Sequence, residues 1–316
     1  MPNISRRKFI NISGVALGMC FLPAELMANQ SKTSWTGTAL GAHANMTLYH
    51  TSESYAQKVL NECVNEVRRL ERVFSLFYRD SAIVALNKEK VLTNPPKELV
   101  ELLLGAQKIS EVSNGSFDVT VQPLWILHAS FFAKKNANPN GPTFEEINRT
   151  KKLIGWEKLS VKKEKIEFTQ KGMAITLNGI AQGYITDKIT ELLEQKGFTN
   201  VLVDLGEMRA LGNHPSGRAW QIGVPYSKEV SNKDGFIKLS NQAVASSGGY
   251  GTQFAKGYHH LFNPHSGTSA NFVKAVSIIA PTATLADALS TTVAVMPKDK
   301  SKKLLSLYPT ITAYIS

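Results

Sequence analysis

The sequence predicts an α+β fold, and three observations support that prediction. Strand-like apolar stretches occur in runs, at 158–177 and again across 219–279. Helical stretches with a 3.6-residue apolar period stand between these runs, without the regular strand–helix–strand alternation of a parallel sheet. The chain has 316 residues, 43% of them hydrophobic, which is enough for a packed core in one large domain or two lobes.

The first half of the chain is expected to begin with a strand region at 35–50, interrupted by glycine near its start. The next segment keeps an apolar residue on one helical face throughout, which predicts an amphipathic helix at 54–74. Residues 75–87 are expected to form a loop. Asn94 and Pro95 are a helix cap followed by proline at the first helical position, so a second helix should run from there to the glycine stop at Gly115.

Beyond that stop, residues 117–121 have the pattern of a strand. The polar, Pro/Gly/Asn-rich loop at 136–142 is a candidate boundary between lobes. Thr143 and Glu146 have the spacing of a capping box and predict a short helix.

The second half is expected to add strands at 158–161, 166–169 and 173–177, and then a helix at 180–196 that ends at a glycine. A buried strand at 201–205 and several short strands across 219–279 follow. The chain should end with an Ala/Leu-rich helix near 285–296, a short helix at 300–307 and a final strand at 311–315.

The N-terminus has the pattern of an export signal. Arg6, Arg7 and Lys8 precede an apolar run at 12–22, and a small residue stands at Ala28. This pattern predicts a twin-arginine signal peptide at 1–28 and a single domain at 29–316, so the protein should be periplasmic. In the alternative interpretation Cys20 is lipidated and anchors the chain to the inner membrane.

Composition narrows the classes of partner. The formal net charge is +11, which favours anionic partners such as phosphates. The lysines are scattered and lack interleaved aromatic residues, so nucleic acid binding is not expected. Removal of 1–28 would leave Cys63 as the only cysteine, at an apolar helix position, so no intramolecular disulfide is expected.

One predicted helix carries a set of oxygen ligands. Asp287, Ser290 and Thr291 are spaced i, i+3 and i+4, which places one carboxylate and two hydroxyls on one face. Oxygen ligands of this kind suit Mg²⁺, which completes its shell with water and substrate phosphate. A solvated polar stripe would have the same spacing.

Two other stretches carry candidate chemistry. Gly179 to Gly183 joins a strand to a helix start, where glycines let the backbone approach a ligand and main-chain N–H groups can face an anion. A plain glycine turn remains the alternative. His259, His260 and His265 surround a proline turn, and a histidine there could act as acid or base near neutral pH. Their spacing matches no common zinc pattern.

Taken together, these stretches resemble the ApbE family, the FAD:protein FMN transferases. The resemblance runs from about Trp35 to the C-terminus and is carried by motifs in family order. They are 36–38, 74–75 with 80–81 and 86–87, 115–124, 179–184, 204–206, 247–248, 260–267 and 286–291. It implies an ApbE-like, T-fold-like arrangement of mixed sheets with packed helices, in two lobes around a flavin cleft.

The resemblance also implies an activity. FAD would be the substrate, Mg²⁺ would bridge its diphosphate, and FMN would pass to a Thr or Ser hydroxyl of a target flavoprotein while AMP leaves. It assigns Mg²⁺ to Asp287 and Thr291, helped by Ser290 and the carbonyl of Gly179, and makes His260 the candidate for activating the target hydroxyl. The residues that it places around FAD are Thr36, Phe77, Ser116, Phe117, Asp118, Thr176, Gln182 and Phe262.

The chain departs from the family pattern at several positions. Gln182 stands where lysine or glutamate is common, Glu207 where a second glycine is, Asn263 where aspartate is, and Thr176 lies near a usual acidic residue. Losing carboxylates at Thr176 and Asn263 is expected to weaken FAD orientation or polarisation of His260. The departures at Thr176, Gln182 and Asn263 motivate one alternative, a non-catalytic FAD-binding or carrier protein. An FAD pyrophosphatase that yields FMN and AMP is a further alternative.

The export signal makes the chain similar to the NosX branch of the family. Acceptors in the family include Rnf-type and Nqr-type subunits and NosR-type proteins. The sequence does not choose among them. Membrane association is expected only through such an acceptor or through a lipidated Cys20.

Overall fold

The computed structural model describes residues 30–224 and 236–316. The predicted signal peptide and Cys20 lie outside the described residues. Within them, no helix is both long and apolar enough to cross a membrane.

The main element is a seven-stranded sheet in the order β1-β2-β6-β7-β10-β15-β16, in which every neighbouring pair is antiparallel. This arrangement confirms the α+β class. Its strands are β1 (Ser31–Ala39), β2 (Ala42–His50), β6 (Val201–Asp204), β7 (Met208–Leu211), β10 (Ala243–Gly248), β15 (Ala275–Ala280) and β16 (Thr312–Ile315).

The predicted strand region at 35–50 is a hairpin. Its turn consists of Leu40 and Gly41, which have φ of 47° and 85°, the positive values that a tight two-residue hairpin turn requires. The turn also gives the main-chain N–H of Leu40 to Oε1 of the buried Glu71, at 2.8 Å. This bond ties the hairpin to the long helix that follows.

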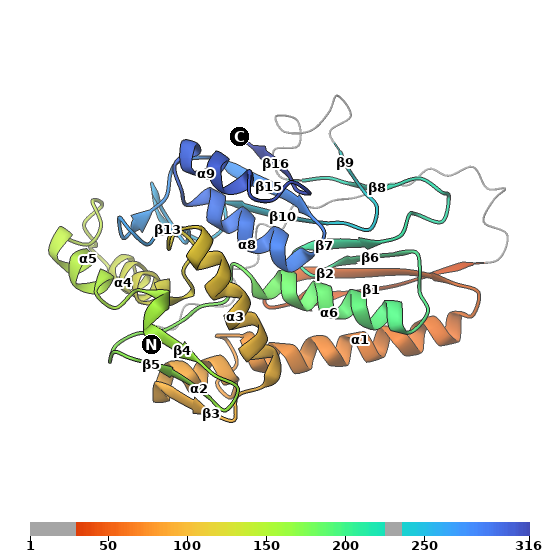
Figure 1. Cartoon of the computed structure of the whole chain (residues 1–316), viewed down its shortest axis with the longest axis horizontal. Coiled ribbons are helices and arrows are strands. Elements are labelled where there is room, and N and C mark those ends of the chain that lie inside the picture. The colour runs from red at the N-terminus through yellow and green to blue at the C-terminus, as the bar shows by residue number, and fades with distance from the viewer. Residues whose placement is uncertain (1–29, 225–235) are drawn as a thin grey trace.

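Three helices pack along one face of the sheet (Figure 1). They are α1 (Glu53–Phe74), α6 (Ala181–Gln195) and α8 (Ala283–Ala294). The apolar face predicted for α1, including Cys63, is buried in the main core together with residues of β2, β6 and α6. The opposite face of the sheet is covered by the hairpin of β8 (Trp220–Ile222) and β9 (Ile237–Leu239), which packs against Ala210, Val244 and Ile279.

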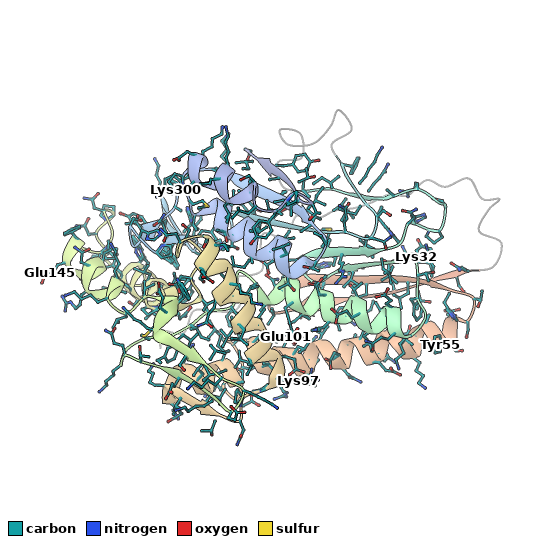
Figure 2. The ribbon with its side chains drawn as sticks, viewed as in Figure 1. Lys32, Tyr55, Lys97, Glu101, Glu145 and Lys300 are labelled. Carbon is teal, nitrogen blue, oxygen red and sulfur yellow. The ribbon has the colours of Figure 1, made fainter. Side chains whose placement is uncertain are left out.

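A second group of elements lies beside the helical layer. It contains α2 (Ala82–Glu89), α3 (Lys97–Val112), α4 (Gln122–Phe132), α5 (Phe144–Lys151) and a small sheet of β3 (Val91–Thr93), β5 (Lys165–Phe168) and β4 (Leu159–Val161). Glu101 of α3, labelled in Figure 2, accepts a hydrogen bond from the hydroxyl of Tyr184 in α6 at 2.9 Å. Two short hairpins, β11 (Gln253–Ala255) with β12 (Tyr258–His259) and β13 (Phe262–Asn263) with β14 (Thr268–Ser269), connect to the sheet, and α9 (Lys298–Leu305) follows α8.

Three local predictions are wrong. Residues 75–87 are not all loop, because Ser81 caps the helix α2. The side chains of Ile83 and Leu86 on this helix are buried. Residues 117–121 form a single 3₁₀ turn at Val119–Val121, and α4 follows it without a break. Residues 173–177 form no strand, since the side chain of Asn87 bonds both the N–H and the carbonyl of Ile175, at 2.7 and 2.8 Å, in place of a strand partner.

The 136–142 loop does not separate two lobes. It joins α4 to α5, which pack against each other, and the hydroxyl of Tyr258 donates to the carbonyl of Asn140 at 2.5 Å. The capping box of Thr143 and Glu146 at the start of α5 is confirmed. The predicted cap of α3 is also wrong, because the helix begins at Lys97 after Pro96 and no side chain caps it. The remaining predicted helices and strands agree with the observed ones within a few residues at their ends.

Candidate functional site

The predicted oxygen set lies on α8 and faces the glycine turn at 179–183. The main-chain N–H of Gly183 donates to Oδ2 of Asp287 at 3.0 Å. A Cβ on Gly179 would lie 2.9 Å from Oγ1 of Thr291. The turn can therefore approach α8 this closely only because Gly179 and Gly183 have no side chains.

Ser247, at the end of β10, completes this group. Its hydroxyl is 2.8 Å from the hydroxyl of Ser290 and 3.2 Å from that of Thr291. The antiparallel β10–β15 pair holds Ser247 opposite Val276, beside α8. The sequence motif at 247–248 did not by itself assign Ser247 to the site, because the position of Ser247 depends on contacts between distant segments.

The donor chemistry fits a hard divalent cation. Asp287 is buried and supplies a carboxylate, Ser247, Ser290 and Thr291 supply hydroxyls, and Gly179 brings main-chain atoms alongside. Burial raises the pKa of Asp287 to about 7, and the charge of Asp187 adds to that effect, although the Gly183 N–H opposes it. A cation would favour the ionised form of this carboxylate.

Two main-chain N–H groups at the start of α6 are already hydrogen-bonded within the protein. Besides Gly183, the N–H of Ala181 is used, by the carbonyl of Leu177 at 2.8 Å. These two N–H groups are therefore not free to bind an anion. Gln182 instead places its side-chain nitrogen 3.4 Å from the carbonyl of Leu205, packed against Gly206.

His260 lies beside the same glycine-rich stretch that carries Ser247. A Cβ on Gly251 would be 2.5 Å from the His260 ring, and Nδ1 lies 3.3 Å from the carbonyl of Thr252. A proton on Nδ1 suits that carbonyl and leaves Nε2 as the basic nitrogen. Burial lowers the pKa of His260 to about 4, helped by neighbouring His259, so the ring is neutral near pH 7.

Asn263 has a different role from the one expected. Its amide nitrogen donates to the carbonyl of Val295 at 2.8 Å, and its oxygen accepts from the N–H groups of His265 and Ser266 at 2.8 and 2.9 Å. It therefore shapes the turn and joins it to the end of α8. The ring nitrogen of His260 is positioned by Thr252, so the expected loss of His260 polarisation through Asn263 is not what the contacts indicate.

Asp118 also holds loops together. Its Oδ1 accepts from the N–H and hydroxyl of Thr120, at 2.7 and 2.6 Å, and its Oδ2 from the N–H of Trp156 at 3.0 Å. Burial raises the pKa of Asp118 to about 6, even though these hydrogen bonds favour the ionised form. A contact of this segment with a ligand would therefore use its main chain or its neighbours rather than this carboxylate.

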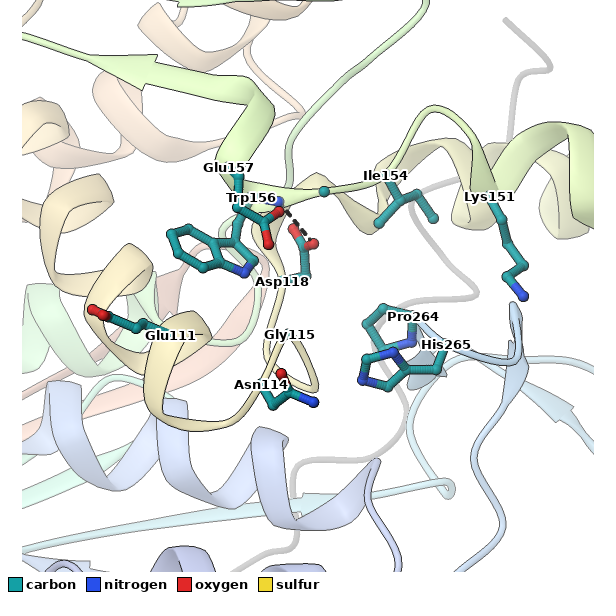
Figure 3. A pocket seen from close by; sticks show the side chains of 11 residues that line it. Glu111, Asn114, Gly115, Asp118, Lys151, Ile154, Trp156, Glu157, Pro264 and His265 are labelled. Atoms are coloured by element: carbon teal, nitrogen blue, oxygen red, sulfur yellow. Dashed lines mark hydrogen bonds between the residues drawn. The ribbon is translucent and has the colours of Figure 1, made fainter.

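A cavity of about 290 Å³ opens beside this loop. Figure 3 shows Trp156 on one side and Pro264 and His265 on the other, with Gly115 and Asp118 between them. The remaining lining residues are Glu111, Asn114, Lys151, Ile154, Gly155 and Glu157. The cavity thus combines an indole wall with polar groups and adjoins the 116–118 segment.

The other predicted FAD residues differ in exposure. Phe77 is 54% exposed and lies next to the β1–β2 turn at Gly41. Thr36 is exposed on β1, and its hydroxyl accepts from the amide of Asn45 at 3.1 Å. Thr176 accepts from the N–H of Asn178 at 3.3 Å, and its own N–H bonds the carbonyl of Val119.

Besides Asp118, three predicted FAD residues are buried. The Phe262 ring is 4.8 Å from the ring of His128, in a cluster with Leu124 and Ile154. Ser116 and Phe117 are also buried, and the main-chain N–H of Phe117 donates to the hydroxyl of Ser113 at 3.0 Å. The rings of Phe117 and Phe262 are therefore packed in two different apolar clusters of the interior.

The described residues offer no cluster of the side chains that usually bind zinc. In the described ranges no three His, Cys, Asp or Glu side chains come together as a metal site. The ring of His259 instead bonds the side chain of Asn271 at 3.2 Å.

Comparison with known proteins decides the family. The model of the ApbE family matches residues 40–315. The chain belongs to the ApbE family.

Two curated relatives of this ApbE chain are named FAD:protein FMN transferase. An FAD:protein FMN transferase of Haemophilus influenzae is 26% identical, over 92% of this chain and 88% of the relative. One of Treponema pallidum is 29% identical, over 80% and 75%.

Solved ApbE structures share the fold. The Thermotoga maritima ApbE protein aligns with a TM-score of 0.76 at 28% identity, over 90% of this chain and 94% of that one. The apo form of the Pseudomonas stutzeri flavinyl transferase ApbE also aligns with a TM-score of 0.76, at 24% identity, over 90% and 91%.

Proposed function

We propose that this protein is a transferase that moves FMN from FAD to an acceptor protein. Family membership and the shared name of its curated relatives support this function. The observation that carries it is the convergence of Asp287, Ser290, Thr291 and Ser247 on the glycine turn at Gly179. Such a group suits the charge neutralisation and positioning that phosphoryl transfer requires.

Asp287 and Thr291, with Ser290 and the carbonyl of Gly179, would hold Mg²⁺. The cation would supply positive charge to the diphosphate of FAD. Asp287 is buried and anchored by Gly183, so its carboxylate is held in place before any ligand arrives. The contact of the Ser247 hydroxyl with Ser290 and Thr291 orients those two side chains in the same way.

His260 is the proposed base. The hydroxyl oxygen of an acceptor Thr or Ser forms a bond to the FMN-side phosphorus, and the bond from that phosphorus to the AMP oxygen breaks. The hydroxyl proton passes to Nε2 of His260, which is neutral and has its other nitrogen directed at Thr252. FMN becomes a phosphoester of the acceptor, and AMP is the second product.

The compartment is part of the proposal. We propose that residues 1–28 direct export, so that the acceptor is a periplasmic flavoprotein domain of the Rnf, Nqr or NosR type. The twin arginine at Arg6 and Arg7 is the support for this step.

The test uses the purified protein with FAD, MgCl₂ and a recombinant acceptor domain. Mass spectrometry of the acceptor should find one added FMN, and the Asp287→Ala variant should add none. Asp299→Ala is the matched control, because Asp299 is an exposed carboxylate on α9 and should leave transfer unchanged. AMP release that is the same with and without acceptor would support FAD hydrolysis instead, and FAD binding without any turnover would support a carrier.

A further inference from the structure

Glu207 is a buried carboxylate next to the proposed cation site. It follows the Asp204–Gly206 turn directly and is 8% exposed. Its carbonyl accepts from the hydroxyl of Thr186 in α6 at 3.2 Å, and its Oε2 accepts from the N–H of Ser246 in β10 at 3.2 Å. Its main chain is therefore bonded to α6 and its side chain to β10, and this helix and this strand both pack against α8, which carries Asp287.

Ser246 and Thr186, the two hydrogen-bond partners of Glu207, lie close in the chain to residues that contact the oxygen set on α8. Ser246 precedes Ser247, whose hydroxyl contacts Ser290 and Thr291. Thr186 lies one turn along α6 from Gly183, which holds Asp287. Burial and the charge of Asp287 both raise the pKa of Glu207, which agrees with two carboxylates within electrostatic reach of each other.

The charges in this region do not balance within the described part of the chain. Asp187, one turn after Gly183 on α6, accepts from the N–H groups of Ala283 and Thr284 at the start of α8 and pairs with Arg209 at 2.6 Å. Asp287 and Glu207 form no ion pair among the described residues. A buried carboxylate without a cation is costly, and two that repel each other are more so.

Asp287 alone would balance only one of the two positive charges of a divalent ion. One of its two oxygens is occupied by the Gly183 N–H, and the hydroxyls of Ser247, Ser290 and Thr291 carry no formal charge. We infer that Glu207 is the second carboxylate of the cation site and that its negative charge balances the second positive charge of a divalent ion held by Asp287, Ser290 and Thr291. This inference rests on the proposed function, because it requires a cation at α8.

The test measures binding of Mn²⁺ alone, by electron paramagnetic resonance of the free ion, to the purified full-length protein without FAD. Glu207→Gln keeps the size of the side chain and removes its charge. We expect this variant to bind Mn²⁺ at least tenfold more weakly than the wild type. We also expect its metal-free form to melt at a higher temperature, because folding no longer buries a carboxyl group whose ionised form is disfavoured by burial and by the charge of Asp287.

The matched control is Glu98→Gln, which removes the charge of another buried carboxylate. Glu98 pairs with Arg69 at 2.7 Å, away from α8. This variant should leave Mn²⁺ affinity unchanged and should lower the melting temperature, since it breaks an ion pair. The two variants thus differ in sign for stability, which a general effect of losing a buried charge cannot produce.

The outcomes separate the inference from the proposed function. Wild-type binding of Mn²⁺ with an unchanged affinity in Glu207→Gln overturns the inference and leaves the function intact. No Mn²⁺ binding by the wild type overturns both. If Glu207→Gln fails to fold, Glu207→Asp is the second variant, because it keeps the charge and should bind Mn²⁺ like the wild type. Binding of Mn²⁺ by Glu207→Asp that is tenfold weaker than that of the wild type would then overturn the inference.

Discussion

The main-chain N–H of Gly183 donates to Oδ2 of Asp287, so the start of α6 and the middle of α8 are joined at the proposed cation site. A Cβ on Gly183 would overlap the carbonyl oxygen of Ala283 and lie 2.9 Å from Cβ of Asp287. Catalytic geometry and helix packing therefore depend on the same glycine.

Gly183→Ala is expected to destabilise the protein. The added methyl group meets backbone on α8, which cannot rotate away, so the two helices must separate at a cost of about 1–3 kcal/mol. Urea unfolding followed by circular dichroism would measure this change. Gly105→Ala is the matched control, since Gly105 lies in α3 with no atom within 4 Å of its added Cβ. That substitution should stabilise by about 0.5–1 kcal/mol, and equal destabilisation of both variants would contradict the packing argument.

Mg²⁺ affinity should depend on pH through Asp287. Its pKa is raised to about 7 without metal, so below that pH a proton must leave before the cation binds. We expect the affinity to fall by up to about tenfold for each pH unit below 7 and to level off above 8. Calorimetric titration with MgCl₂ from pH 5.5 to 8.5 would show this. A constant affinity between pH 6 and 8 would rule out proton competition at this carboxylate.

Local sequence pattern predicted the elements whose side chains repeat with one period. The helix α1 was predicted because its apolar residues all face one core, and the oxygen set on α8 because three residues on one helix share a face. The short helix α2 and the turn at Asp118 depend on single caps, from Ser81 and Asp118, which an apolar pattern does not register.

Site residues from distant segments were harder to predict. Ser247 reaches α8 only through strand pairing and the packing of β10 against that helix, and Glu207 is joined to β10 by its bond to Ser246. No periodicity in the sequence encodes such contacts. Their neighbours gave a signal all the same, because Ser247 and Glu207 both stand next to glycines in motifs that carried the family resemblance.

Loss of the His260 ring should slow transfer without abolishing FAD binding. His260→Ala removes the proposed base, and we expect the transfer rate to fall by about 10²–10⁴-fold while the dissociation constant of FAD changes by less than about threefold. Single-turnover FMN transfer and fluorescence titration with FAD would measure the two quantities. A large loss of FAD affinity with a small change in rate would assign His260 to substrate binding.

The pH dependence of transfer should not show protonation of His260 near neutrality. Its pKa is lowered to about 4, so the base is already unprotonated at pH 6. At saturating Mg²⁺, the wild-type rate should stay flat between pH 6 and 8 apart from effects of the metal site. His259→Asn removes the neighbouring ring that helps to lower this pKa, so it should move the pKa of His260 back towards its ordinary value. A wild-type rate that rises steadily between pH 6 and 8 at saturating Mg²⁺ would contradict the prediction.

The Asp118 carboxyl should make stability fall as pH rises. Its pKa in the folded protein is about 6, above its ordinary value near 3.8, because burial disfavours the ionised form. The folded state therefore holds a proton that the unfolded state has lost between pH 4 and 6, so this group contributes its full stability below pH 4 and loses it as pH rises through 6. Asp118→Asn carries no such proton. Unfolding free energies at pH 4, 5, 6 and 7 should show the wild type losing stability relative to the variant over that interval, whereas parallel curves would mean that the hydrogen bonds from Thr120 and Trp156 fully offset the cost of burial.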